Sequence, residues 1–325
     1  MLNVLVVGGA GFIGSHMVKM LGQQGYRVTT LDDLSSGHRD AVLAGDFVQG
    51  DMGDRAVLDA VLSRGFDAVM HFASFIQVGE SVQKPASYYQ NNVVKTLGLL
   101  DAMRTHGIQR FVFSSTAATF GEPQYSPIDE KHPQQPVNPY GRTKLMVEQV
   151  LADYALAYGF RSVSLRYFNA AGADPEGLLG ERHDPETHLI PLVLQVAAGR
   201  RPHLQVFGRD YDTPDGTCIR DYVHVTDLCS AHALALQSLM AGQGADCQAY
   251  NLGSGHGFSV QEVIDTAQKV SGRSVAVMDS PRRPGDPSRL VADPTLARLN
   301  LGWQPQHSDL RTLIEHAWRW ETRKT

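Results

Sequence analysis

Short apolar runs alternate with amphipathic segments over the first half of the chain. Five apolar runs have the length and composition of buried strands, at residues 3–7, 27–31, 68–72, 110–114 and 162–166. Three segments between them repeat apolar side chains at helical spacing, at residues 13–25, 92–107 and 140–159. Each of these three ends in glycine, which readily takes the left-handed conformation that follows many helices. The alternation predicts βαβ units and a parallel sheet covered on both faces by helices.

The pattern changes after Asn169. Residues 172–187 are rich in Gly, Pro, Asp and Glu and are predicted to form a loop. Helical patterns then occur at residues 191–199, 226–240, 260–271 and 310–320. The chain has 325 residues, which exceeds the ~250–300 at which single cores stop growing, so two lobes are expected.

The predicted fold class is α/β. Residues 1–170 are expected to form a Rossmann-type, doubly wound parallel sheet, and some later segments, about 216–252, are expected to return to it. Residues 171–325 are expected to form a smaller α+β substrate-binding domain. Ligands of such sheets bind outside the carboxyl ends of the strands, so the site is expected between the two parts.

The charge and hydrophobicity of the chain argue against two kinds of partner, nucleic acids and membranes. The formal net charge is −5 at pH 7, whereas a protein that binds nucleic acid usually carries a basic footprint. The Arg-Arg pairs at 200–201 and 282–283 are too short for one and suit a small anionic ligand better. No apolar segment approaches the ~20 residues of a membrane span, and the N-terminal run lacks the features of a signal peptide. We therefore predict neither a nucleic-acid nor a membrane partner.

The cysteines bear on location and on metals. Cys218, Cys229 and Cys247 are an odd number without a CxxC spacing. This argues against a disulfide framework and a metal cluster, and it suits a reducing cytosol. The sequence therefore predicts a cytoplasmic protein without a metal site.

A glycine-rich turn follows the first predicted strand and opens the first predicted helix. Gly8 and Gly11 allow a tight turn in which backbone N–H groups approach a pyrophosphate, and Gly14 lets the helix pack on the sheet. Asp32 ends the next strand at about the ~20-residue offset expected of a ligand for a ribose 2′-hydroxyl. A carboxylate there would repel a 2′-phosphate, so the predicted cofactor is NAD and not NADP. The GxxGxxG spacing is typical of extended short-chain dehydrogenases.

Further cofactor contacts are predicted at the ends of other strands. Asp51 and Met52 follow one apolar run, and Phe72 and Ala73 follow another. Because ligands bind at the carboxyl ends of parallel strands, these pairs are expected to contact the adenine and the nicotinamide ribose.

Tyr140 and Lys144 are four residues apart, and so share one face of the helix predicted after Pro139. A tyrosine with a pKa of about 10 is a poor base at neutral pH. The Lys144 ammonium and a positive nicotinamide ring are expected to favour the phenolate and to lower the pKa of Tyr140. The run 110–114 continues into hydroxyl residues, in the order that Ser/Thr–Tyr–Lys enzymes use. Thr116 is therefore expected to hydrogen-bond the reacting oxygen of the substrate beside Tyr140.

Several other stretches have a spacing without a purely structural rationale. The chain resembles the UDP-glucose 4-epimerase family over nearly its whole length, in residues 8–17, 78–82, 88–93, 138–148, 165–169, 216–225, 250–253 and 282–286. The resemblance implies that Tyr140 removes the proton of the sugar 4′-hydroxyl while C4′ passes a hydride to tightly bound NAD⁺. The 4-keto sugar then turns over and takes the hydride back on its other face, which interconverts UDP-glucose and UDP-galactose without net redox change.

The resemblance also implies roles for particular residues. Tyr140 is the catalytic base and acid, Lys144 holds the cofactor ribose and tunes Tyr140, and Thr116 assists at the sugar hydroxyl. Further contacts with the cofactor are implied for Phe12, Ile13, Asn91, Ser114 and Tyr167.

Residues of the second half are implied to bind the UDP-sugar. Asn169, Arg220 and Arg283 would grip the diphosphate, and two arginine forks would offset its negative charge. Asp286 resembles the ligand of the uridine ribose, and Phe207 stands where the family packs a residue near the uracil.

Three positions of the cleft vary within the family. His188, followed by the substrate-binding candidate Leu189, stands where some relatives have an asparagine that contacts substrate. Leu290 occupies the position thought to set the width of the pocket, so it also counts as a substrate-binding residue. Ile76 stands where some relatives carry a lysine near the cofactor.

Other functions compete with a UDP-hexose 4-epimerase. A nucleotide-sugar 4,6-dehydratase needs an acid/base pair after Thr116, where this chain has Ala117 and Ala118. A non-catalytic NAD-binding regulator would be expected to have lost Tyr140 or Lys144, and a net dehydrogenase would need an exchangeable cofactor. An epimerase acting on a UDP-N-acetylhexosamine or a UDP-pentose is the alternative of the same class.

The resemblance also predicts a homodimer. The helices predicted at residues 92–107 and 140–159 are expected to pack against their mates. Apolar side chains at helical spacing support this, at Leu145, Val150, Leu151 and Tyr154.

Overall fold

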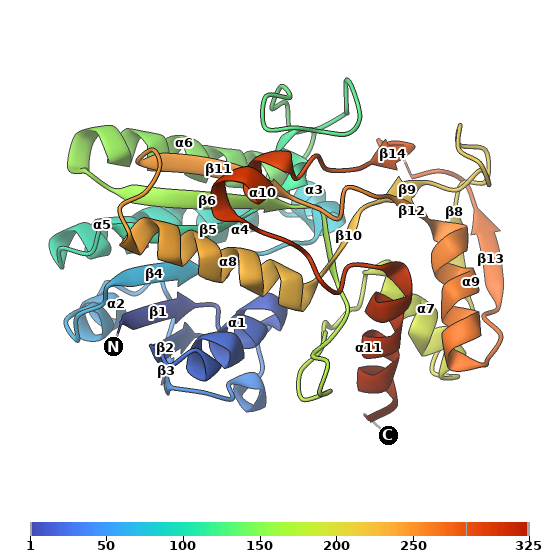
Figure 1. The fold of residues 1–325 in the computed structure, drawn as a ribbon, viewed down its shortest axis with the longest axis horizontal. Helices are drawn as coiled ribbons and strands as arrows, with labels where there is room; N and C mark the ends of the chain where they lie inside the picture. The colour runs from blue at the N-terminus through green and yellow to red at the C-terminus, as the bar shows by residue number, and fades with distance from the viewer. Residues whose placement is uncertain (1, 284, 324–325) are drawn as a thin grey trace.

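A seven-stranded, all-parallel sheet forms the centre of the computed structural model, which describes residues 2–283 and 285–323 (Figure 1). The strand order is β11-β6-β5-β4-β1-β2-β3. In chain order the strands are β1 (Asn3–Val7), β2 (Arg27–Asp32), β3 (Asp46–Gln49), β4 (Ala68–His71), β5 (Arg110–Thr116), β6 (Arg161–Tyr167) and β11 (Cys247–Leu252). The predicted α/β class with a doubly wound parallel sheet is confirmed.

The five strands predicted from apolar runs are present within two residues of their expected ends. The pattern did not reveal β3, because as a half-exposed edge strand it alternates too little. It did not single out β11 either, although β11 pairs along its whole length with β6 at the other edge.

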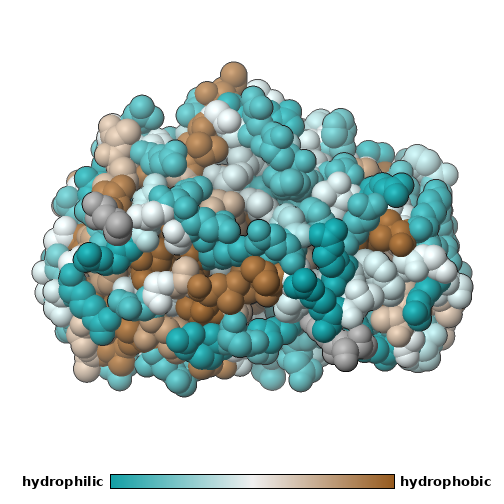
Figure 2. Space-filling model, turned by 60° about the horizontal axis from the view of Figure 1, so that its bottom comes forward, coloured by the Kyte–Doolittle hydropathy of each residue, from teal (hydrophilic) through white to brown (hydrophobic). Residues whose placement is uncertain are grey.

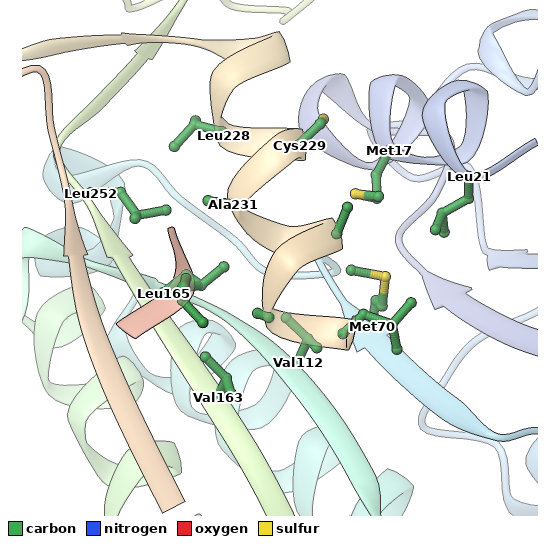
Figure 3. Close-up of a cluster of buried hydrophobic side chains, with 14 of the residues drawn as sticks. Met17, Leu21, Met70, Val112, Val163, Leu165, Leu228, Cys229, Ala231 and Leu252 are labelled. Atoms are coloured by element: carbon green, nitrogen blue, oxygen red, sulfur yellow. The ribbon is translucent and has the colours of Figure 1, made fainter. Parts of the chain in front are cut away.

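Helices cover both faces of the sheet, as the side-chain alternation of the strands requires. Val4 and Val6 of β1 point to one face, where α1 (Phe12–Gln23) and α8 (Val225–Met240) pack. Figure 3 shows this core, with Leu228, Cys229 and Ala231 of α8 above the strands. Leu5 and Val7 point to the other face. There the helices are α2 (Arg55–Leu62), α5 (Lys95–Thr105) and α6 (Pro139–Tyr158).

The glycines predicted to follow three helices have left-handed backbone angles, with φ of +80° at Gly25 and +70° at Gly107 and Gly159. The expected helix at 92–107 is more complex than predicted. It is preceded by α3 (Val78–Gln83), α4 (Pro85–Tyr89) and a π-helical turn, Gln90–Val94.

The second half gathers at the end of the sheet towards which the strands run (Figure 1). Residues 172–187 form neither helix nor strand, as predicted. The helices here are α7 (Leu189–Ala197), α9 (Val260–Ser271) and α11 (Leu310–Arg323). Helix α10 (Thr295–Leu301) instead returns to the central sheet, where it packs against α8 and β11. Short strands pair as β7 (Asn169–Ala171) with β10 (Tyr222–His224), β8 (Leu204–Phe207) with β13 (Val277–Ser280), and β9 (Ile219–Arg220) with β12 (Phe258–Ser259) and β14 (Arg289–Leu290).

Helix α6 turns towards the sheet three of the four side chains that were expected to meet a second subunit, and the fourth, Leu145, is partly buried. Leu151 is fully buried in the core beneath the sheet, and Val150 and Tyr154 pack against the same core. The expectation that Leu151 contacts a partner is therefore wrong, because the side chain faces the sheet. The apolar side chains that α6 exposes are instead Met146, Leu156 and Tyr158, and Leu156 is 90% exposed.

Among residues 2–283 and 285–323, no helix is both long and apolar enough to span a bilayer. Figure 2 shows hydrophobic side chains near the middle of one face, framed by hydrophilic ones. The thiols of all three cysteines are free.

Candidate functional site

A continuous cleft extends from the carboxyl ends of the central strands to the short strands of the second half. Its walls include all the side chains and backbone segments assigned above to cofactor, catalysis and substrate. Residues far apart in the chain, such as Asp32, Tyr140 and Arg283, therefore surround one space. Ile76 also lines the cleft and is 40% exposed.

The glycine-rich turn lies at one end of the cleft and cannot accommodate larger residues. Gly8 has a φ of +81°, and a Cβ there would lie 2.4 Å from the backbone nitrogen of Ala73. A Cβ at Gly14 would lie 2.1 Å from the Gly8 carbonyl oxygen. Gly11 precedes α1, and no side chain caps that helix. The first N–H groups of α1 and the positive end of its dipole therefore suit a phosphate.

Two carboxylates lie at the ends of the neighbouring strands. Asp32 accepts hydrogen bonds of 2.9 Å from the backbone N–H groups of Ala10 and Leu34, while burial raises its pKa. The two amides hold the carboxylate beside the glycine-rich turn, where a ribose hydroxyl can donate to it. Asp51 forms an ion pair of 2.8 Å with Lys95, which keeps the pKa of Asp51 below its usual value although burial by itself would raise it.

Tyr140, Lys144 and Thr116 meet where α6 passes the end of β5. Asn138 caps α6 by accepting a hydrogen bond of 2.8 Å from the Gly141 N–H. Tyr140 and Lys144 are one turn apart on this helix. The Tyr140 hydroxyl faces the side chain of Thr116, and the Lys144 ammonium donates to the Ser114 carbonyl oxygen at 2.7 Å. A proton acceptor, a cation and a hydroxyl are thus within reach of one reacting atom.

The pKa of Tyr140 is raised in the protein alone, whereas the lowering expected from the sequence also counted a positive nicotinamide ring. Burial raises the pKa of Tyr140, and the hydrogen bond with Thr116 offsets this only in part. Burial also lowers the pKa of Lys144 to about 7. Because Lys144 is itself desolvated, it does not supply the full positive charge that the sequence argument assumed.

Sequence reasoning missed the residues that hold Lys144 in place. The ammonium donates a hydrogen bond of 2.8 Å to the Ser74 hydroxyl, which follows the predicted Phe72–Ala73 pair. Next to it lies a buried ion pair in which Arg166 donates to Glu148 at 2.6 Å. Glu148 is one turn after Lys144, so the i, i+4 spacing was a usable signal for it. The contact with Ser74 depends on the tertiary fold and left no such signal.

Two further cofactor candidates are held by hydrogen bonds. Tyr167 is buried, and its hydroxyl hydrogen-bonds that of Ser114. Asn91 donates to the buried Asn92 at 3.1 Å, and Asn92 in turn contacts Thr143 of α6 at 3.1 Å.

The far side of the cleft is lined by the arginines of the second half. The Arg283 guanidinium lies over the Phe207 ring, 3.9 Å from its centroid. Arg220 and Asp286, which were assigned to different parts of the ligand, form an ion pair with each other. Asn169 donates a hydrogen bond of 3.0 Å to the Asp221 carbonyl oxygen. These contacts hold the side chains of Asn169, Arg220 and Arg283 at the wall of the cleft.

The three remaining substrate candidates border this region. Leu290 of β14 lies beside Arg220 of β9 in the strand register. His188 immediately precedes α7, whose first residue is Leu189, and its Nδ1 contacts the Glu181 carboxylate.

Comparison with known proteins places the chain among enzymes of one kind. The model of the NAD dependent epimerase/dehydratase family matches residues 4–253. A UDP-glucose 4-epimerase of Rhizobium meliloti is 52% identical over 323 residues, which cover 99% of this chain and 98% of that protein.

Solved structures show the same fold over the same length. UDP-glucose 4-epimerase from Brucella ovis, in complex with NAD, superimposes with a TM-score of 0.96 at 55% identity and covers 98% of both chains. The enzyme from Bifidobacterium longum, in complex with NAD⁺ and UDP, superimposes with a TM-score of 0.92 at 39% identity. That match covers 99% of this chain and 98% of the other.

Proposed function

The chain belongs to the UDP-glucose 4-epimerases of the NAD-dependent epimerase/dehydratase family, and we propose that it interconverts UDP-glucose and UDP-galactose with NAD as its bound cofactor. The observation that carries the proposal is the meeting of Tyr140, Lys144 and Thr116 in a cleft whose far wall holds two arginines. Tyr140, Lys144 and Thr116 suit proton transfer at a sugar hydroxyl. The arginines suit a diphosphate.

The residues around the glycine-rich turn fit NAD. The uncapped start of α1 can hold the pyrophosphate, and the oriented carboxylate of Asp32 can accept from the ribose hydroxyls. Lys144 reaches the same region and can hold the second ribose. When bound, NAD⁺ would accept the hydride that leaves C4′ of the sugar, and its positive charge would favour the Tyr140 phenolate.

Tyr140 then takes the proton of the sugar 4′-hydroxyl and later returns it. Thr116 can hydrogen-bond the same oxygen, because its hydroxyl already lies beside that of Tyr140. Burial disfavours the phenolate, so the side chain holds its charge only while a cation lies next to it. Tyr140 can therefore remove the sugar proton only when the cofactor occupies the cleft.

The second half holds the nucleotide. Arg220 and Arg283 can each donate paired hydrogen bonds to the diphosphate, and Asn169 lines the same cleft. Asp286 stays next to Arg220 and can accept from the uridine ribose, while Phe207 can stack beside the uracil. Binding through the diphosphate leaves the sugar free to turn over when it has become a 4-keto sugar.

Two methyl groups disfavour the dehydratase alternative. Ala117 and Ala118 line the cleft directly after Thr116. A 4,6-dehydratase must remove a proton from C5 and expel the C6 oxygen, and neither alanine can transfer a proton.

We extend the proposal to assembly, organisation and location. The exposed Met146, Leu156 and Tyr158 of α6, with Val94 before α5, offer an apolar face for a second copy of the chain.

Residues 1–170, with about 216–252, form the NAD-binding domain, and residues 171–325 form the UDP-sugar-binding domain. The free thiols suit a reducing, cytoplasmic location.

The test is to incubate the purified protein with UDP-glucose, UDP-N-acetylglucosamine and UDP-xylose, without added NAD, and to separate the products. We expect UDP-galactose from UDP-glucose, with the other two substrates converted more slowly. Dependence on added NAD with accumulation of NADH would indicate a dehydrogenase, and a 4-keto-6-deoxy product would indicate a dehydratase. Absence of any product would contradict the proposal.

A further inference from the structure

The loop before α7 brings two glutamates and two histidines together beside the cleft. Their pattern in the chain is Glu181-x-His183-x-x-Glu186-x-His188. One ligand atom from each side chain lies within 4.8 Å of all the others. The Nδ1 of His183 is 2.9 Å from the Glu181 carboxylate and 3.7 Å from that of Glu186, and the Nδ1 of His188 also contacts Glu181. Four potential ligands therefore converge on one point.

The two carboxylates are withdrawn from solvent. The exposed fraction is 5% for the Glu181 side chain and 6% for that of Glu186, against 43% for His188. The two carboxylates therefore face the imidazoles of the loop inside the protein rather than water.

We propose that Glu181, His183, Glu186 and His188 form a binding site for one divalent transition-metal ion of the zinc type. Zn²⁺ binds imidazole nitrogen and carboxylate oxygen at about 2.0–2.2 Å in a tetrahedron, so its ligand atoms stand about 3.4 Å apart. The four ligand atoms of this loop lie within 4.8 Å of one another, a spread that a tetrahedral ion can draw together. Two imidazole ligands disfavour Mg²⁺ and Ca²⁺, which take oxygen ligands.

The surroundings hold the ligands in place. The Glu186 carboxylate accepts hydrogen bonds from the backbone N–H groups of Thr187, at 2.8 Å, and His188, at 2.9 Å. Such outer contacts orient ligands and contribute to metal affinity. The His183 ring packs edge-on against Phe12 of the glycine-rich turn, with centroids 6.5 Å apart. A metal here would fasten the loop to the start of α7, next to the cofactor end of the cleft.

The site leaves His188 able to serve a substrate. The Nδ1 atom faces Glu181 and is the one that would bind the metal. A neutral imidazole that binds a metal through Nδ1 carries its proton on Nε2, so Nε2 remains a hydrogen-bond donor. The metal site therefore orders the cleft wall and adds no step to the epimerisation.

The direct test is titration of the NAD-loaded protein with Zn²⁺ in a calorimeter, in buffer with excess Mg²⁺. We expect one Zn²⁺ per chain with a dissociation constant of about 1 μM or tighter. X-ray absorption at the zinc edge should show a mixed nitrogen and oxygen shell with two imidazoles. Failure to saturate below about 100 μM, or a shell without imidazole, would overturn the proposal.

Variants separate this site from adventitious surface binding. His183→Gln and Glu186→Gln should each weaken binding by more than about 100-fold, because loss of a direct ligand exceeds the 10–100-fold cost of an outer contact. The matched control is His106→Gln, since His106 also lies beside a carboxylate, 2.9 Å from Asp59, but without a second histidine. It should bind Zn²⁺ as the wild type does. Equal affinity in His183→Gln and the wild type would contradict the assignment.

Two further measurements on the wild-type protein test the site even if a variant folds poorly. Zn²⁺ should raise the thermal unfolding temperature of the wild type by mass action, and the increase should be lost in Glu186→Gln. Wild-type protein substituted with Co²⁺ should show the intense visible absorption of a tetrahedral site. An octahedral spectrum would refute the proposed geometry. These outcomes do not depend on whether the protein is an epimerase.

Discussion

Lys144 donates a hydrogen bond of 2.7 Å to the carbonyl oxygen of Ser114, and this bond sets the register of α6 against β5. Tyr140 and Lys144 are separated by four helical residues, or about 6 Å along the helix axis. Thr116 and Ser114 are separated by two strand residues, or about 6.6 Å along the strand. Because these distances match, the bond between Lys144 and Ser114 brings Tyr140 opposite Thr116.

The first prediction concerns the Tyr140 hydroxyl. Tyr140→Phe should fold and retain bound NAD but lose about 10²–10⁴ in turnover, the usual contribution of general acid–base catalysis. The control is Tyr154→Phe on the same helix, whose side chain packs on the core. Near-full turnover in Tyr140→Phe, measured with UDP-galactose as substrate, would remove Tyr140 from the mechanism.

The second prediction separates two neighbouring arginines. Arg283→Met should raise KM for UDP-glucose by about 10–100-fold, with a smaller change in kcat, since a hydrogen bond to a charged group contributes about 1.5–3 kcal/mol. Arg282→Met should have little effect, because Arg282 is bound to Asp210 outside the cleft. Similar KM values for both variants would mean that Arg283 does not hold the diphosphate.

The third prediction concerns the choice of sugar. Leu290 fills space beside Arg220, and an acetamido group at C2′ needs extra room when the sugar turns over. Leu290→Cys should raise kcat/KM for UDP-N-acetylglucosamine relative to UDP-glucose by about 10–200-fold, the range of a misfit of ~1–3 kcal/mol. If the wild type already converts both substrates equally well, pocket width is set elsewhere.

The fourth prediction concerns acid stability. Burial lowers the pKa of His71 to about 3 and that of His232 to about 4, so both are neutral in the folded protein where unfolded histidines, with a pKa of about 6.5, take up protons. The unfolded state then binds more protons, so the free energy of unfolding should fall as the pH falls from about 6.5 to 4, by up to about 1.4 kcal/mol per pH unit for each histidine.

Urea unfolding at several pH values across this window measures the slope. His232→Gln should flatten it, whereas His203→Gln, at an exposed position, is the control. An unchanged slope in His232→Gln would show that this histidine is already charged in the folded state.

The fifth prediction tests assembly. Leu156→Glu places a charge on the exposed face of α6 and should convert the expected dimer into a monomer at micromolar concentration, as sedimentation would show. Leu178→Glu is a matched change at a half-exposed leucine of the 172–187 loop and should remain dimeric. A monomeric wild type would refute the dimer outright.

Local patterns were enough to predict much of the fold and site. The apolar runs of β1 and β5, the glycines after the helices and the spacing of Tyr140 and Lys144 are properties of neighbouring residues, and such properties appear in the sequence. The resemblance added the second-half residues, such as Arg283, whose spacing has no local meaning.

Features that depend on tertiary contacts could not be predicted in the same way. The desolvation of Tyr140 and Lys144 arises from chain segments that pack over them, and Ser74 becomes a partner of Lys144 only in the folded sheet. His188 was predicted to contact substrate, and no role was predicted for His183. Their convergence on Glu181 depends on the path of an irregular loop.

The pairing of β11 with β6 has a consequence for synthesis of the chain. The ribosome completes β6 at Tyr167 but must add residues 168–246 before the neighbouring strand begins at Cys247. At about 5–20 residues per second this takes roughly 4–16 s. During that interval the nascent chain presents β6 as an unpaired sheet edge, a ready template for strands of other chains. Newly made protein is therefore most prone to aggregate before its last central strand has emerged.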